Sequence, residues 1–148
     1  MTMVYLIDIN AFLALAWPNH PHHGTAIHWF DNLGADQWAT CATTQLGFVR
    51  ISCQPKFSRY HVSPESACDM LDQWTKRSGH VYWHEETNGL LAPEFRKLRH
   101  RILTHNFVTD GFLASVAAGN QGKLATFDRP LANVFPDIVE LISHHTPS

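Results

Sequence analysis

Cysteine, charged residues and long apolar runs are all scarce in this 148-residue chain. It holds three cysteines, and only 16% of its residues are charged. Three scattered cysteines in apolar surroundings indicate reduced core thiols in a cytoplasmic protein. No apolar run approaches the ~18 residues of a membrane-spanning helix, and no Lys or Arg precedes the first apolar stretch. We therefore expect neither a signal peptide nor a membrane span.

A strong excess of either charge is also missing. Lys and Arg number 11 and Asp and Glu number 13, which gives a formal charge of −2. This balance neither indicates nor excludes a nucleic-acid partner, because a local basic stripe can lie opposite an acidic site. The hydrophobic fraction of 45% is that of a globular chain, and a chain of this length can bury a real core.

What the chain does contain is an alternation of strand and helix patterns, with no repeat, low-complexity tract or linker-like change in composition. This alternation predicts one α/β domain, residues 1–148, with a central, mainly parallel sheet flanked by helices. Strands are expected at 3–7, 38–42, 81–83, 123–127 and 138–142. Helices are expected at 11–17, 22–33, 44–51, 63–79 and 89–102, the last of which Pro93 can break, and from 109 onward.

Three aspartates stand where predicted strands stop or helices start. Asp8 and Asp128 follow strand-like runs, and Asp110 opens a helical pattern. Carboxylates so placed can converge at the sheet edge where ligands bind α/β folds. They repel one another there unless a divalent cation such as Mg²⁺ or Mn²⁺ joins them. Because water polarised by such a cation can attack a phosphodiester, the trio predicts a metal-dependent hydrolytic centre.

Each of these residues also has a simpler explanation. Asp after a strand is a common turn residue, and Asp110 in a first helical turn is favourable through the helix dipole alone. Asn10 can orient Asp8 or bond a metal-bound water, or it can cap the helix that starts at Ala11. Thr126 is first of all a strand residue, although its hydroxyl could face the site. The three aspartates taken together favour a function.

Basic side chains gather just upstream of Asp110, where they could hold a nucleic-acid backbone. These side chains are Arg96, Lys97, Arg99 and Arg101. The alternative for this stretch is a solvated helix face. Lys56, Arg59 and Tyr60 form a second, weaker basic patch, and Arg50 could pair with an acid.

Five motifs, spread over nearly the whole chain, match one protein family. They are Tyr-Leu-Ile-Asp-Ile-Asn at 5–10, Trp-Ala-Thr-Cys at 38–41, Thr-Gln-Leu-Gly-Phe-Val-Arg at 44–50, Val-Thr-Asp-Gly-Phe-Leu-Ala at 108–114 and Leu-Ala-Thr-Phe-Asp-Arg at 124–129. With them the chain resembles the PIN-domain ribonucleases of toxin–antitoxin systems, the VapC toxins.

The resemblance implies a PIN-like three-layer sandwich, with a central, mainly parallel sheet between layers of helices. It implies cleavage of RNA phosphodiester bonds that depends on Mg²⁺ or Mn²⁺ and takes place inside the cell. It also implies a homodimer and a small antitoxin that blocks the site. The metal-site acids of the family carry over to Asp8, Asp110 and Asp128, and we expect Gln45 and Asn10 to position water or a carboxylate.

Gln45 stands where the family usually has a second acid, a Glu at the start of the third helix. An amide oxygen can coordinate a cation or hold a water molecule, but it brings no negative charge. The chain is therefore expected to be an endoribonuclease toxin or, alternatively, a catalytically weak or inactive module that binds RNA or an antitoxin. A third hypothesis, a phosphotransferase with Asp8 as nucleophile, needs a second acid two residues on, where Asn10 stands.

Overall fold

The structure, a computed structural model, describes residues 2–59, 61–85 and 88–143. Its centre is a five-stranded sheet in the order β3-β2-β1-β4-β5, in which every neighbouring pair is parallel. The parallel sheet and the five strands expected from the sequence are thereby confirmed. The strands are β1 Val4–Ile7, β2 Gln37–Thr40, β3 His80–Tyr82, β4 Lys123–Thr126 and β5 Val139–Leu141.

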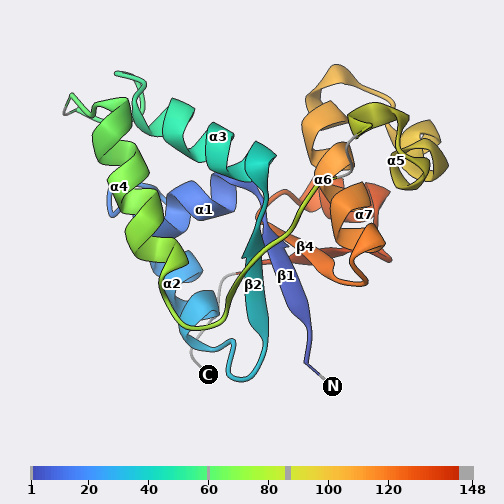
Figure 1. Ribbon diagram of the computed structural model, residues 1–148, viewed down its shortest axis with the longest axis horizontal. Coiled ribbons are helices and arrows are strands. Elements are labelled where there is room, and N and C mark those ends of the chain that lie inside the picture. Colours follow the sequence, from blue (N-terminus) through green and yellow to red (C-terminus); the bar gives the residue numbers. More distant parts are fainter. Residues whose placement is uncertain (1, 60, 86–87, 144–148) are drawn as a thin grey trace.

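Helices cover both faces of this sheet, so the domain has the three layers that were expected (Figure 1). One face carries α1 Ile9–Ala16, α2 His23–Asp31, α3 Ala42–Ser52 and α4 Pro64–Thr75. The other face carries α5 Pro93–Leu98, α6 Val108–Gly119 and α7 Arg129–Val134. Three short 3-10 helices complete the described elements: η1 Gly89–Leu91, η2 Arg99–Arg101 and η3 His105–Phe107.

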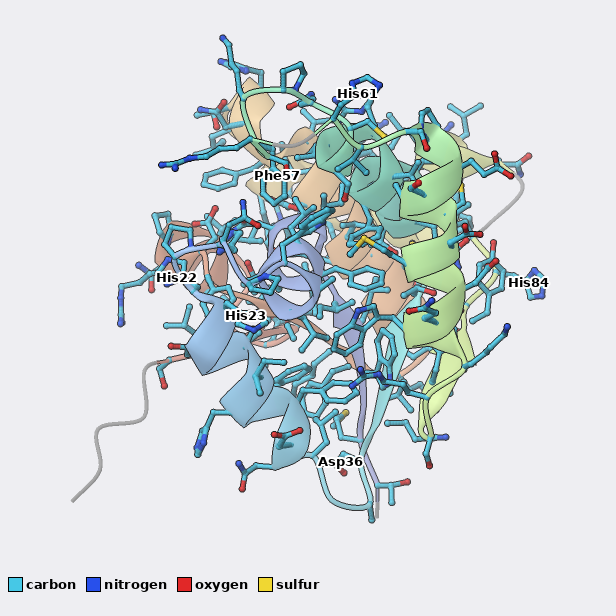
Figure 2. All side chains as sticks on the ribbon, turned by 90° about the vertical axis from the view of Figure 1, so that its left-hand side faces the viewer. His22, His23, Asp36, Phe57, His61 and His84 are labelled. Carbon is cyan, nitrogen blue, oxygen red and sulfur yellow. The ribbon has the colours of Figure 1, made fainter. Side chains whose placement is uncertain are left out.

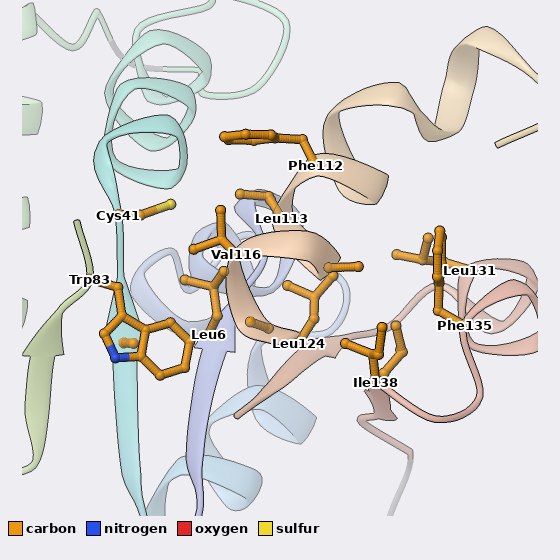
Figure 3. Close-up of a cluster of buried hydrophobic side chains, with 14 of the residues drawn as sticks. Leu6, Cys41, Trp83, Phe112, Leu113, Val116, Leu124, Leu131, Phe135 and Ile138 are labelled. Carbon is orange, nitrogen blue, oxygen red and sulfur yellow. The ribbon is translucent and has the colours of Figure 1, made fainter. Parts of the chain in front are cut away.

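The central strands supply both hydrophobic cores. Successive side chains of a strand point to opposite faces of a sheet, so Leu6 enters the core beneath α6 while Ile7 enters the core beneath α1 and α3. Figure 3 shows the first of these cores, where Leu6 lies near Leu113 of α6. In the second core the rings of Phe12 and Phe48 stack at 4.3 Å and join α1 to α3.

The segment expected to be helical at 89–102 is interrupted just before Pro93, where the sequence allows a break. The segment forms η1, α5 and η2 in succession. Pro93 begins α5, because proline lacks the N–H that a helix interior needs but fits its first turn. The structure also contains α7, which follows Asp128 directly and for which no helix was expected.

The three cysteines are free thiols, but they are not all in the core. Cys41 is buried, whereas Cys68 lies exposed on α4, so the expectation of core thiols is wrong for Cys68. Within the described residues no helix has the length and apolar character needed to span a bilayer.

Candidate active site

Asp8 is almost fully buried and is held at both carboxylate oxygens. Strand β1 ends at Ile7, and Asp8 caps the following helix because its Oδ1 accepts the backbone N–H of Ala11 at 2.7 Å. Its Oδ2 accepts a hydrogen bond from the hydroxyl of Thr126. The cap lets the chain pass from strand to helix within one residue, and it fixes the carboxylate at the carboxyl end of β1.

Thr126 links Asp8 to Asp128. Strands β1 and β4 are parallel neighbours, so Asp8 and Thr126 lie side by side at the same edge of the sheet. The Thr126 hydroxyl, besides donating to Asp8, accepts the backbone N–H of Asp128 at 3.0 Å. The Oδ1 of Asp128 then caps α7 by accepting the backbone N–H of Leu131 at 3.0 Å.

Asp110 reaches this edge from the first turn of α6. It lines a pocket of about 540 Å³ together with Asp8 and Asp128, so the three predicted aspartates meet in one place. Both polar and apolar side chains complete the wall. They are Ile9, Asn10, Leu13, His20, Pro21, Arg50, Ile51, Phe57, Thr109 and Thr126.

The pocket concentrates negative charge that nearby protein groups do not neutralise. Burial and then the charge of Asp110 raise the pKa of Asp8 to about 7. Burial and then the charge of Asp128 raise the pKa of Asp110 to about 6. Arg50 lines the same pocket, but in the described part of the chain it forms no ion pair with an aspartate. Repulsion of this kind is what a bound cation relieves.

The donor set fits a hard divalent cation held by few protein ligands. Carboxylate oxygens suit Mg²⁺ and Mn²⁺, and Mg²⁺ commonly uses one or two carboxylates while keeping several waters. Within residues 2–59, 61–85 and 88–143, no three His, Cys, Asp or Glu side chains are grouped to hold a metal ion. The raised pKa values of Asp8 and Asp110 make that pair the best candidate, and Asp128 adds a third carboxylate to the same pocket.

Comparison with known sequences identifies the family. The chain is 35% identical over 131 residues to ribonuclease VapC39 of Mycobacterium tuberculosis, which covers 88% of this chain and 93% of that protein. The chain belongs to the VapC ribonuclease family. It is also 33% identical over 127 residues to VapC44 of the same species, a match that covers 86% of this chain and 87% of that protein. To VapC29 of the same species it is 32% identical over 142 residues, which covers 95% of this chain and 97% of that protein. No family model matches the chain.

Solved structures confirm the fold of this VapC chain. VapBC2 from Rickettsia felis, solved bound to a DNA fragment from its promoter, matches with a TM-score of 0.67 at 16% identity. That match covers 95% of this chain and 100% of the other. FitAcB from Neisseria gonorrhoeae matches with a TM-score of 0.56 at 19% identity, over 93% of this chain and 96% of that one.

The two predicted neutral site residues of this VapC chain lie in different places. Asn10 lines the acid pocket, where its Oδ1 is 2.9 Å from Nε2 of His20. It does not cap α1, because Asp8 does so and the helix begins before Ala11. Gln45 is not among the residues that line the pocket, and its Nε2 donates to the Thr40 hydroxyl at 3.1 Å. Its part in the site stays a prediction.

The basic stretch at 96–101 does not line the acid pocket. Three of its predicted RNA-binding side chains have partners within the protein: Arg96 donates to the Leu91 carbonyl, Lys97 pairs with Glu94, and Arg101 pairs with Asp137. Arg99 lies in the same stretch, in η2. The role of these four residues in nucleic-acid binding stays a prediction.

Sequence reasoning missed His20 and Phe57, which line the same pocket as the aspartates. Their positions in the chain carry no signal of it, because the loop after α1 and the loop after α3 meet only in the folded protein. Tyr60, which was placed in the weaker basic patch, lies outside the described residues.

Proposed function

We propose that this VapC-family chain is an endoribonuclease toxin that hydrolyses RNA phosphodiester bonds with the help of Mg²⁺ or Mn²⁺. Membership of a family whose relatives are named ribonucleases supports nuclease activity. The observation that carries the metal dependence is the pair Asp8 and Asp110, whose pKa values are raised by burial and by the charge of a neighbouring aspartate in the same pocket.

The residues of the pocket have distinct parts in this proposal. Asp8 and Asp110 would hold the cation, which supplies a polarised water and offsets the charge that develops on the phosphoryl oxygens. Thr126 holds Asp8 in place through its hydroxyl. Asp128 adds negative charge to the pocket while its Oδ1 caps α7. Asn10 lies within the same pocket and can position water.

We further propose that the chain acts in the cytoplasm as a homodimer, with a small antitoxin as its partner. Family membership supports this proposal, and VapBC2 of Rickettsia felis shares the fold. An antitoxin that blocks the enzyme would have to cover the acid pocket.

The test is cleavage of labelled RNA by the purified protein with Mg²⁺ or Mn²⁺, with and without a chelator. Asp8→Asn should keep the helix cap and lose more than ~100-fold in rate, the scale of losing an electrostatic contributor at a reacting centre. Asp69→Asn, an exposed position on α4, is the matched control and should keep full activity. Equal cleavage by Asp8→Asn would reveal a contaminating nuclease and contradict the proposal.

Gln45 favours a second candidate function, a module that binds RNA or an antitoxin without cutting. Its amide donates to Thr40, whose hydroxyl lies 2.8 Å from Nε2 of His80. A carboxylate at position 45 could not donate, so the Thr40 hydroxyl would have to donate to it instead. If the missing acid is what weakens the site, Gln45→Glu restores a negative charge and should raise the Mg²⁺ affinity measured by calorimetry. If the unaltered chain already binds Mg²⁺ and cleaves RNA, the binding-module hypothesis fails.

A further inference from the structure

We propose that single-stranded RNA leaves the acid pocket across the ring of Phe57 and continues along the cations Lys56 and Arg59. The proposal rests on the proposed function, because it takes RNA as the substrate of the acid pocket. It goes further by assigning a nucleobase-stacking residue and a path for the strand. The path runs over the loop between α3 and α4, away from the basic stretch at 96–101.

Phe57 forms part of two pockets at once. It lines the acid pocket, and it also lines a second pocket of about 630 Å³. Lys56, Arg59 and Trp17 line that second pocket as well. One side chain therefore separates the place where a phosphodiester would react from a hollow bordered by two cations. Figure 2 shows Phe57 beside α1, on the face that also bears His22 and His23.

The ring of Phe57 is held in place from several directions. Trp17 meets it edge to face at 5.8 Å. The backbone on either side of the ring is fixed, because the Phe57 carbonyl accepts from Asn19 at 3.0 Å and its N–H donates to Gln54 at 3.0 Å. The side chain is half-buried, so part of it still reaches solvent. A rigid, partly open aromatic ring is the kind of platform on which unpaired bases stack.

The cations along this path are available to an anion. Lys56 and Arg59 are exposed, and neither has an ion pair among the described residues. Arg50 is also exposed and lines the acid pocket itself. In the basic stretch, two of the four cations, Lys97 and Arg101, pair with carboxylates of the same chain. Free cations next to a stacking ring match a nucleic-acid strand, whereas an acidic protein segment has no base to lie on Phe57.

The experiment measures binding of a short labelled single-stranded RNA by fluorescence anisotropy in Mg²⁺. Every variant is made in the Asp8→Asn background, which lacks one of the carboxylates proposed to hold the cation. Phe57→Leu should weaken binding about tenfold, as the loss of one base–aromatic stack does, while Phe57→Tyr should bind as before. An RNA with abasic positions should lose this difference, because it has no bases to stack.

Salt dependence tests the cations separately. Each lost phosphate contact lowers the slope of log affinity against log salt by ~0.7 for a single strand. The double variant Lys56→Ala/Arg59→Ala should therefore lower the slope by about 1.4. The matched control Arg96→Ala/Lys97→Ala should leave it unchanged. If the slope of log affinity against log salt fell only in Arg96→Ala/Lys97→Ala, the RNA strand would lie on the basic stretch and the proposal would be overturned.

Two further results would also overturn this path. If Phe57→Leu weakened the binding of normal and abasic RNA equally, the ring of Phe57 would support the fold and would not stack on a base. Binding of a polyglutamate peptide with the same dependence on Phe57 would assign the surface to an acidic protein partner. Failure of the proposed function looks different: the unaltered chain would leave RNA intact in Mg²⁺ while its RNA binding still depended on Phe57.

Discussion

At the scale of single residues, the buried carboxylate of Asp8 lowers the stability of the fold when it is charged. Its pKa rises from 3.8 to about 7, chiefly because burial disfavours the charged form. An acid whose pKa is higher in the folded state stabilises the fold fully at low pH, and this stability is lost as pH rises through 7. The metal-free protein should therefore be less stable at pH 8 than at pH 5 as far as Asp8 is concerned.

Asp8→Asn should stabilise the metal-free protein at pH 8 while it removes activity. The amide can still cap α1, and it carries no charge to bury. The expected gain is at most about 4 kcal/mol, which is the rise of the pKa from 3.8 to about 7 taken at ~1.4 kcal/mol for each pKa unit. Urea unfolding in chelator at pH 8 and at pH 4 measures it, and the gain should vanish at pH 4. A variant less stable than the unaltered chain at pH 8 would contradict this account of Asp8.

Thr126→Val should lower the rate of RNA cleavage about tenfold with little change in shape. The substitution removes a hydrogen bond to a charged carboxylate, which is worth ~1.5 to 3 kcal/mol, and it leaves the N–H of Asp128 without its acceptor. Thr126→Ser keeps the hydroxyl and should restore the rate. The pH profile is the deciding measurement: it should move upward in Thr126→Val, because a bond that lowers the Asp8 pKa is lost. An unmoved profile would mean a purely structural role.

The acids of the site were predictable from the sequence, but their surroundings were not. Each aspartate follows a strand or opens a helix, and such positions gather at one edge of a parallel sheet. His20 and Phe57 belong to loops whose meeting depends on how α1 packs against α3. Gln45 lies in the expected helix, but its side chain donates a hydrogen bond to Thr40. The spacing of residues in the sequence does not predict this hydrogen bond.

At the scale of elements, the junction between α1 and α3 holds the site in place. Gly47 of α3 lies against Ile9 of α1, the residue next to Asp8, and a Cβ at position 47 would collide with the Ile9 side chain. Glycine permits this close approach of the two helices. The alternation of strand and helix patterns was enough to predict these elements. In the segment 89–102 the break at Pro93 was foreseeable, because proline does not fit a helix interior, but the pattern did not separate η2 from α5.

Gly47→Ala should destabilise the fold by about 1 to 3 kcal/mol, the usual cost of overpacking a filled core. It should also slow cleavage, because the displaced Ile9 adjoins Asp8. Gly24→Ala, in α2, is the matched control: an added Cβ there meets nothing within 4 Å, so the change should be neutral or slightly stabilising. Unfolding by urea measures both variants. If both glycines tolerate alanine equally, the close packing of α1 on α3 does not matter.

At the scale of the whole molecule, the net charge is close to zero, but acidic and basic side chains gather in two separate regions. The formal charge is −2, yet one edge of the sheet gathers Asp8, Asp110 and Asp128. Exposed cations lie on the neighbouring loop between α3 and α4. A cation bound among the acids would convert that edge from a region that repels RNA into one that accepts it. Membership of the VapC ribonuclease family agrees with such a site.

The rate of RNA cleavage as a function of Mg²⁺ concentration tests the central claim most directly, measured in parallel for the unaltered chain and for Asp110→Asn. The account predicts a rate that rises with Mg²⁺ to a plateau, falls to background in chelator, and drops more than ~100-fold in Asp110→Asn. Cleavage that persists in chelator, or that is equal in the two proteins, would contradict a metal-dependent ribonuclease centred on Asp8 and Asp110.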